Sequence, residues 1–244
     1  STNILFSIAN AYSDLDPLPE DKLHQIFNKT IENQIIIYGN NHPLLAKTYL
    51  QYGFALKTFG DNQKSTEFAN KAMVIAQSNF GENHMLIARI NILFSQLNLI
   101  ENNMEAAIPQ LENAVKIYQS QYGDDHFETN QAKTTLAGYY LKEGQGEKAL
   151  DMLQPLYALL IQQFGESHKA TIYAKMNIIK AYNLKGEFQL AVNEGLKLFT
   201  LSKESLGQEA IITIGTQILL AESYLNTNNY PDAIEMCQQL LSFS

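Results

Sequence analysis

Phe80-Gly81-Glu82-Asn83-His84 is one copy of a phrase, aromatic-Gly-x-x-His, that recurs along the chain. The other complete copies are Tyr38-Gly39-Asn40-Asn41-His42, Tyr122-Gly123-Asp124-Asp125-His126 and Phe164-Gly165-Glu166-Ser167-His168, and a degenerate fifth copy is Leu206-Gly207-Gln208-Glu209-Ala210. The glycines at 39, 81, 123, 165 and 207 are 42 residues apart, without insertion or deletion. This period predicts a single repeat domain with repeats of approximately 1–42, 43–84, 85–126, 127–168, 169–210 and 211–244.

A helix, a short turn, a second helix and a loop fill each repeat. In the second repeat, Pro43 stands at a favoured first-turn position, and apolar residues follow it at steps of three and four up to a break at Gly60-Asp61. We expect the second helix from about Gln63 to Asn79, with Gly81 as its C-terminal cap. Because no repeat shows a strand pattern, the sequence predicts an all-α superhelix (α-α solenoid) of about six stacked helical hairpins, or twelve helices.

The turn inside each hairpin is marked by glycine or asparagine. Gly144 and Gly186 mark it in the fourth and fifth repeats, and asparagine pairs mark it at 102–103 and 228–229, where glycine is absent. In the first repeat, Asp16-Pro17-Leu18-Pro19 replaces the usual turn. We therefore expect the first repeat to be a modified capping repeat.

The composition argues against several classes of protein. The chain has 244 residues, of which 45% are hydrophobic, with no run near the roughly 18–20 apolar residues of a membrane span and no signal-peptide pattern, so we expect a soluble, cytoplasmic protein. The 17 Lys and Arg against 25 Asp and Glu give a net charge of −8, which argues against nucleic acid or anionic lipid as a partner. Cys237, the single cysteine, matches the positions of Leu111 and Leu153, which predicts a buried, inert thiol.

With its 42-residue repeat of paired helices, the chain resembles the tetratricopeptide repeat family. Within that family it resembles the 42-residue variety found in kinesin light chains and many bacterial regulators. The resemblance covers the whole chain, and the Gly-x-x-His-Pro junction of the light-chain variety is complete only at 39–43. It rests on Leu136-Ala137, Tyr140, Gly144 and Ala149 in the fourth repeat, on Tyr182, Gly186, Phe188 and Ala191 in the fifth, and on Leu220-Ala221, Tyr224, Tyr230 and Ala233 in the sixth. The resemblance implies a superhelix whose first helices line a concave groove, in a protein that we predict to be a bacterial regulator.

No residue pattern indicates catalysis, a cofactor or a metal. Four histidines recur one repeat apart, but equivalent positions in stacked repeats lie on the order of 10 Å apart, whereas the ligands of one zinc ion lie about 2 Å from it. We interpret each histidine as a residue that holds the loop or the start of the next first helix. Acid pairs such as Asp124-Asp125 belong to loops beside helix N-termini, and no nucleophile-base set or phosphate-binding glycine loop is present in the sequence. We therefore do not expect an enzyme.

The predicted first helices are more basic than the rest of the chain. The approximate windows are 1–14, 43–59, 85–101, 127–143, 169–185 and 211–227. They hold nine basic and five acidic residues, a sum of +4, and the remaining residues sum to −12. A groove lined by these helices would attract an acidic or carboxyl-terminated peptide. The alternative is a solvated face on which the lysines are incidental.

The resemblance also implies which side chains line the groove. Carried over repeat by repeat, these positions are Lys47, Leu50, Phe54 and Lys57; Arg89, Ile92, Gln96 and Leu99; Gln131, Thr134, Gly138 and Leu141; and Tyr173, Met176, Lys180 and Asn183. The positions of the peptide-clamping asparagines of kinesin light chains hold Gln51, Leu93, Thr135 and Asn177, so only Asn177 matches. Cations, amides and apolar anchors are mixed, as in surfaces that bind an extended peptide or a helix.

Three functions are compatible with these observations. The first is an interaction scaffold that binds a peptide or partner protein in its groove as part of a larger regulatory protein. The second is a sensor domain that binds a signal peptide or small molecule and controls an attached effector, and the third is an oligomerisation module. The chain stops inside the sixth repeat at Leu240-Leu241-Ser242-Phe243-Ser244 without a polar capping helix. We therefore expect a fragment of a longer protein, or self-association through the C-terminal face.

Overall fold

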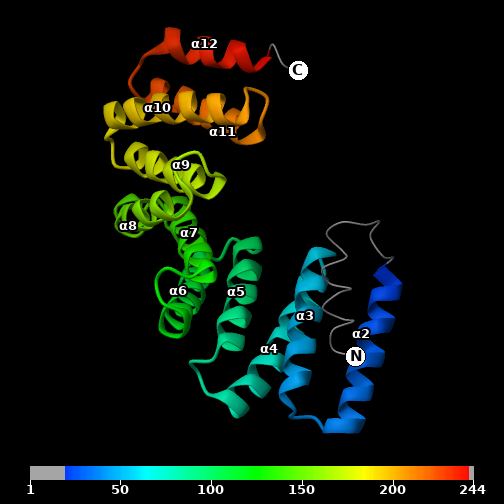
Figure 1. Cartoon of the computed structure of the whole chain (residues 1–244). Helices are drawn as coiled ribbons and strands as arrows, with labels where there is room; N and C mark the ends of the chain where they lie inside the picture. The colour runs from blue at the N-terminus through cyan, green and yellow to red at the C-terminus, as the bar shows by residue number, and fades with distance from the viewer. Residues whose placement is uncertain (1–19, 242–244) are drawn as a thin grey trace. The chain divides into compact units, whose positions relative to one another are not determined.

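The chain divides into two compact units, residues 1–121 (unit 1) and residues 122–244 (unit 2), in a computed structural model that describes residues 20–241. Within the described range every regular element is an α-helix (Figure 1). The expected first helix of the first repeat and the turn at Asp16–Pro19 lie outside the described residues.

The described helices keep the 42-residue period of the sequence. Unit 1 contains α2 (Glu20–Tyr38), α3 (Pro43–Thr58), α4 (Asn62–Phe80), α5 (Met85–Ile100) and α6 (Met104–Tyr122), whose last residue is the first of unit 2. Unit 2 contains α7 (Phe127–Lys142), α8 (Gly146–Phe164), α9 (Lys169–Leu184), α10 (Phe188–Leu206), α11 (Ile211–Asn226) and α12 (Tyr230–Leu241). The helices α3, α5, α7, α9 and α11 each have 16 residues, and α4, α6, α8 and α10 each have 19. The second helix expected at about 63–79 is confirmed, one residue longer at each end.

Each complete aromatic-Gly-x-x-His phrase forms the junction between two hairpins. Its histidine makes two contacts that hold this junction. The Nδ1 atom accepts a hydrogen bond from the backbone N–H two residues later, at 3.1–3.4 Å. The imidazole stacks on the aromatic ring four residues earlier, with ring centroids 4.0–4.7 Å apart. The cap satisfies an N–H group that has no partner inside the helix, and the stack holds the intervening loop. The interpretation of the four histidines as residues that fix the next first helix is therefore confirmed.

The glycines of the junctions and turns provide left-handed backbone. Gly81 has φ 72° and its N–H donates to the Gln77 carbonyl at 3.0 Å, which confirms the expected C-terminal cap. At the turns inside the hairpins, Asn102 and Asn228 take the same left-handed conformation, with φ of 56° and 59°. Asparagine is the residue other than glycine that enters this region most readily, so these two repeats keep the turn without glycine.

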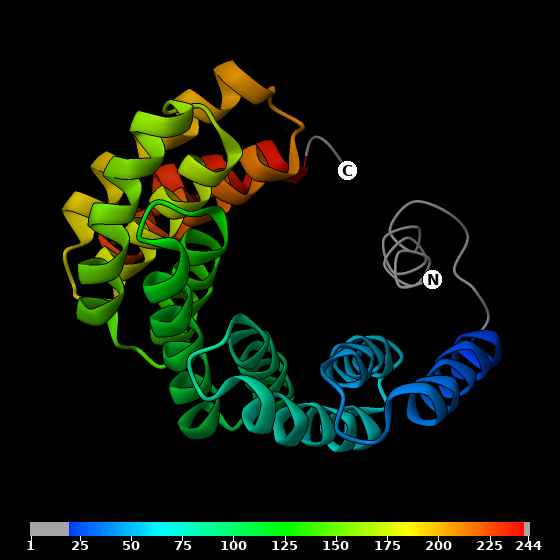
Figure 2. The ribbon, with the colours of Figure 1, turned by 60° about the horizontal axis from the view of Figure 1, so that its bottom comes forward.

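Small residues allow the two helices of a hairpin to pack closely. Ala149, Ala191 and Ala233 are buried, and so is Ser65, whose hydroxyl donates to the Gly53 carbonyl on the facing helix at 2.7 Å. In unit 2, α9, α10 and α11 lie next to one another (Figures 1 and 2) and share one hydrophobic cluster. Its buried members are Ile172, Met176, Ile179, Ala191, Leu198, Ile212 and Leu219. The apolar faces of successive helices thus cover one another, as the repeat pattern predicts.

The prediction of a buried Cys237 is wrong. Cys237 is exposed on α12, whereas Leu111 and Leu153 at the matching positions are buried. The difference follows from packing, because α12 contacts α11 and has no following hairpin among the described residues. The sequence position was matched correctly, but burial at that position requires a neighbour on the other side.

The first prediction concerns the stability of the His84 junction. His84 caps α5 through the Leu86 N–H at 3.1 Å and stacks on Phe80 at 4.0 Å. Replacing His84 by alanine removes both contacts, and we expect a loss of about 1–2 kcal/mol in the free energy of unfolding, measured by urea denaturation at pH 8. An unchanged unfolding curve would show that the stack and the cap do not stabilise the junction.

The second prediction is that the cap of His84 weakens in acid. Burial, and then the charge of Lys47, lower the pKa of His84, so folding favours the neutral ring that accepts the Leu86 N–H. A depressed pKa contributes stability above the unfolded value of about 6.5, and this contribution is lost as the pH falls through the folded value. The stability difference between the wild type and His84→Ala should therefore shrink from pH 8 to pH 5. A difference that stays constant would contradict a neutral cap.

The third prediction uses the degenerate junction. Ala210 has the backbone conformation of the other caps, with φ −64° and ψ 134°, but offers no side-chain acceptor to α11. Ala210→His should supply the missing cap and raise the free energy of unfolding of unit 2 by about 0.5–1 kcal/mol, as seen in urea denaturation. Leu206 packs on the hydrophobic cluster of α9–α11 and provides no aromatic ring, so the full stack should not form. A destabilised variant would contradict this reasoning.

Candidate functional site

Unit 2 contains an open groove between the N-terminal halves of α7 and α9 and the C-terminal end of α8. Its volume is about 890 Å³. The lining residues are Asp125, Phe127, Asn130, Gln131, Thr134, Thr135, Leu160, Gln163, Phe164, His168, Lys169, Ala170, Tyr173 and Asn177, and we call this set the unit 2 groove. Four of the site residues predicted from the sequence, Gln131, Thr134, Tyr173 and Asn177, lie in it together.

The junction phrases build one end of this groove. Phe164 and His168 form the stack that starts α9, and both also line the groove. The Asp125 carbonyl accepts hydrogen bonds from the Asn130 amide at 3.4 Å and from the Gln163 amide at 3.3 Å, which ties the preceding junction to α7 and α8. The groove is therefore held by the same contacts that keep the repeats in register.

Half-exposed aromatic rings and uncommitted amides line the groove. Phe127, Phe164 and Tyr173 are 68%, 49% and 47% exposed, which is high for aromatic side chains. The side-chain amides of Gln131 and Asn177 have no hydrogen bond to any described residue, so they are free to pair with a ligand. Aromatic surface with a few polar groups is the usual lining of a ligand site.

The hydroxyl groups of the groove act as acceptors. Thr134 donates its hydroxyl hydrogen to the Asn130 carbonyl at 2.8 Å, and Thr135 donates to the Gln131 carbonyl at 2.9 Å. Their donors are therefore used inside α7, and their remaining lone pairs can accept from a ligand. A backbone N–H would suit these acceptors.

Phe127, Phe164, Gln163 and Lys169 line the groove but were not predicted as site residues. Phe164 belongs to the junction phrase, and its sequence position indicated only a structural role. Phe127 is the first residue of α7, where the second repeat has Pro43. A large aromatic residue at this solvent-facing helix start is a sequence signal that could have identified it.

In unit 1, three predicted residues meet between α3 and α5. The Lys57 ammonium donates to the Gln96 side-chain carbonyl and lies 5.9 Å from the centre of the Phe54 ring. Burial lowers the pKa of Lys57 because desolvation disfavours its charged form. Lys47 and Arg89 are exposed at equivalent positions of α3 and α5, and Ile92 is partly buried.

Two of the predicted groove residues belong to the core instead. Leu50 is only 1% exposed because α3 is packed against α2, α4 and α5. Met176 is buried in the hydrophobic cluster shared by α9, α10 and α11. Leu141 is partly buried and Lys180 is exposed, and neither lines the unit 2 groove.

The positive charge expected on the first helices is partly neutralised by other elements. Lys133 forms an ion pair with Asp124 at 2.6 Å, and Lys175 pairs with Glu194 of α10. The Lys175 and Lys197 side chains, which hydrogen-bond Glu194, lower the pKa of this carboxyl. A cavity of about 220 Å³ beside this cluster is lined by Tyr157, Glu166, Lys175, Glu194, Lys197, Leu198 and Leu201. Counting charges within the first helices could not show these pairs, because the partners lie outside those helices, Asp124 in the loop before α7 and Glu194 on α10.

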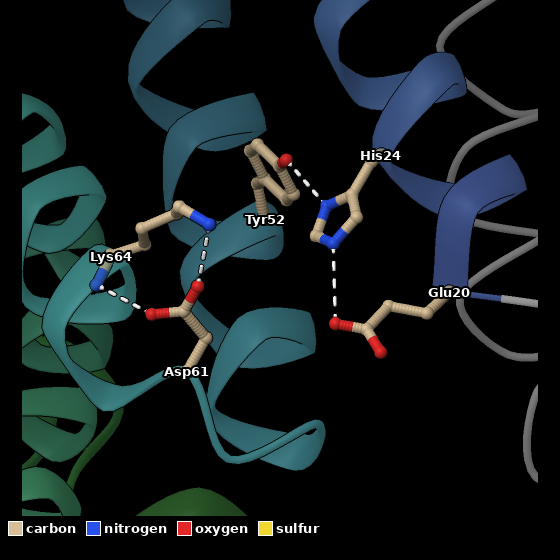
Figure 3. Close-up of polar contacts among 5 residues, drawn as sticks. All are labelled: Glu20, His24, Tyr52, Asp61 and Lys64. Atoms are coloured by element: carbon tan, nitrogen blue, oxygen red, sulfur yellow. Dashed lines mark hydrogen bonds and ion pairs between the residues drawn. The ribbon is translucent and has the colours of Figure 1, made fainter.

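A second polar network links α2 to α3 in unit 1 (Figure 3). His24 lies 2.7 Å from the Tyr52 hydroxyl through Nδ1 and 3.3 Å from Glu20 through Nε2, and Asp61 pairs with Lys64 at 2.8 Å. Tyr52 is buried, its ring stacks on Phe27 at 4.6 Å, and burial raises the pKa of its hydroxyl, which favours the neutral phenol. The arrangement ties two helices together through a protonated hydroxyl. In the sequence, the only indication of this network is His24, the one histidine that does not follow the 42-residue period.

Two further observations bear on the class of protein. Among residues 20–241, no three His, Cys, Asp or Glu side chains are placed to hold one metal ion. No helix in the same range is both long and apolar enough to cross a lipid bilayer.

Comparison with known proteins identifies the fold. No protein-family model and no curated protein matches the sequence. Among solved structures, "kinesin light chain nearly identical TPR-like repeats" from Podosopora anserina are 18% identical, cover 82% of this chain and 95% of theirs, and superpose with a TM-score of 0.72. The apo form of RapI is 15% identical and covers 97% of this chain and 68% of its own, with a TM-score of 0.67. A Rap protein complexed with Competence and Sporulation Factor is 14% identical and covers 97% and 69%, with a TM-score of 0.59.

The chain therefore has the fold of tetratricopeptide-like α-α solenoids. The expected fold class is confirmed by these structures and by the consecutive packed helices. That the chain comes from a bacterial protein stays a prediction.

Proposed function

We propose that this chain is a non-enzymatic interaction scaffold that binds a peptide segment of a partner protein in the unit 2 groove. The observation that supports this proposal most directly is that four residues selected from the sequence line one groove of about 890 Å³. Folds of this kind serve many functions, so the argument rests on the site and not on the fold.

The chemistry of the groove suits an extended peptide with a large apolar side chain. Phe127, Phe164 and Tyr173 offer aromatic surface to this anchor, and burying it would remove their exposed rings from water. The amides of Gln131 and Asn177 can each pair with both an N–H and a carbonyl of a peptide backbone. Affinity would come mainly from the anchor, and orientation from the amides.

The charges in the groove do not favour an acidic ligand over a neutral one. Asp125 and Lys169 have opposite signs and both line the groove. The expected preference for acidic peptides therefore has no support in unit 2, and the bound segment there is proposed to be apolar in character.

A ligand-controlled sensor is the second candidate. The Rap protein of similar fold was solved in complex with Competence and Sporulation Factor, which supports a bound signal as an alternative to a partner protein. Under this alternative, the chain would have two conformations with different affinities for the ligand. Binding would then shift the population towards the conformation of higher affinity and change the shape of the chain. Small-angle X-ray scattering with and without a bound peptide would separate the two candidates.

The fourth prediction tests the groove directly. Peptides selected from a displayed random library against the purified chain should contain an aromatic or large aliphatic anchor. Tyr173→Ala should weaken a selected peptide by roughly tenfold or more in isothermal titration calorimetry, and Asn177→Ala should weaken it by a smaller factor.

Tyr230→Ala is the matched control. Tyr230 is a tyrosine of unit 2 that is 55% exposed on α12 and lies outside the groove, so this variant should bind like the wild type. The proposal fails if no peptide is enriched, or if the two tyrosine variants lose affinity equally.

A further inference from the structure

The last described helix of unit 2 carries an exposed row of apolar side chains. On α12, Tyr230, Ile234 and Leu241 are 55%, 55% and 74% exposed, and Cys237 is exposed as well. These four positions follow one another at steps of four, three and four residues, so they form one row along the helix. We call this row the α12 seam, and the helix that carries it lies at an edge of unit 2 (Figure 1).

The matching row of the preceding hairpin is covered by a helix. One repeat before Ile234 and Leu241 stand Val192 and Phe199 of α10. Both are buried, with 8% and 7% exposure, in a hydrophobic cluster that includes Leu220 of α11. In that hairpin the row is therefore the surface on which the next helix packs, and the α12 seam has the side chains of such a packing surface.

The charged side chains of α12 lie away from the seam. At about 100° per residue, Glu235 and Asp232 lie about 100° and 160° around the helix from Ile234. Pro231 and Gln238, which flank the seam, are exposed and neutral. The chain has a net charge of −8, so two copies repel each other at long range. At the α12 seam two copies can meet without placing like charges opposite one another.

We propose that two copies of this chain associate through the α12 seam, with the two α12 helices antiparallel about a two-fold axis. A two-fold interface must be complementary to itself, and the spacing of the seam meets this condition. With the axis between residues 235 and 236, Tyr230 faces Leu241 of the second copy and Ile234 faces its Cys237. Each contact then joins a larger apolar side chain to a smaller one, which fills the space between the helices.

The area of the seam is sufficient for a weak dimer. Its four exposed side chains give roughly 400 Å² of apolar surface per copy, at about 100 Å² each. Interfaces between identical chains are about 65% apolar, so this core corresponds to about 600 Å² per copy, or about 1,200 Å² in total. Specific interfaces begin at about this size, and we expect association in the micromolar range. The inference goes beyond the proposed function, because it uses neither the unit 2 groove nor its ligand.

The fifth prediction is that the purified chain passes from monomer to dimer between about 1 μM and 1 mM, as measured by sedimentation velocity. Ile234→Glu should stay monomeric over this range, because the pair would bury two carboxylates without a partner. Val74→Glu is the matched control, since Val74 is 67% exposed on α4 and the variant adds the same charge away from the seam. It should dimerise like the wild type, and both variants should keep the wild-type circular dichroism spectrum.

A mixture of two variants tests the antiparallel orientation. Cys237→Lys alone should be monomeric like Ile234→Glu, because its ammonium would face an apolar side chain of the second copy. When the two variants are mixed, the introduced carboxylate faces the introduced ammonium and the other contact of the pair is native. The mixture should therefore regain the dimer. A parallel pair would not bring the two introduced charges opposite each other.

The native thiol provides a second readout. Cys237 is the single cysteine of the chain and is exposed on the seam, so a dimer would cover it. The rate constant for its alkylation by iodoacetamide should fall several-fold in the wild type from the lowest to the highest protein concentration. In Ile234→Glu the rate constant should not depend on protein concentration.

Three results would overturn the inference. They are a wild type that stays monomeric over the whole concentration range, a dimer that Ile234→Glu does not dissociate, and a mixture of Ile234→Glu with Cys237→Lys that stays monomeric. Peptide binding in the unit 2 groove should be the same in Ile234→Glu and in the wild type. Failure of the dimer therefore leaves the proposed function standing, and failure of peptide binding leaves the dimer standing.

Discussion

The stack between an aromatic ring and a histidine four residues later is the contact on which the rest of this structure depends. At His42, His84, His126 and His168 the same imidazole stacks on the preceding ring and accepts a hydrogen bond from the first turn of the next helix. Two weak interactions thus set where each hairpin ends and the next begins. Because the loop length is constant, every first helix starts 42 residues after the one before.

A constant frame lets equivalent positions carry different chemistry. The fifth residue of these helices is a good example, since α3, α5, α7 and α9 have Lys47, Arg89, Gln131 and Tyr173 there and all four are exposed. In unit 1 this position is cationic, and in unit 2 it presents an amide and then an aromatic ring. The repeat therefore conserves backbone geometry while the surface changes from charged to apolar along the chain.

The electrostatic character of each unit depends on which acids lie near its lysines. In unit 2, Lys133 forms an ion pair with Asp124, and Lys175 forms one with Glu194. A neighbouring carboxylate therefore neutralises the charge of each lysine. In unit 1, the hydrogen bond that Lys57 makes with a described side chain is to the neutral amide of Gln96. The sum of charges along the first helices was counted correctly, but the field at the surface depends on pairs that these lysines form with residues outside the first helices.

The sequence by itself determined the helices, their boundaries within about one residue in the second repeat, the turns at Gly60 and Asn102, and the role of the histidines. These features follow from local rules: a glycine or asparagine accepts left-handed backbone, and an acceptor side chain caps a helix within two residues. Only the tertiary structure decided which side chains reach solvent. Leu50 became core and Cys237 became exposed, because burial depends on whether a neighbouring helix covers the position. Likewise, the unit 2 groove and the Lys57–Gln96 contact bring together residues about 40 positions apart in the sequence. A local sequence pattern cannot predict which of these side chains touch.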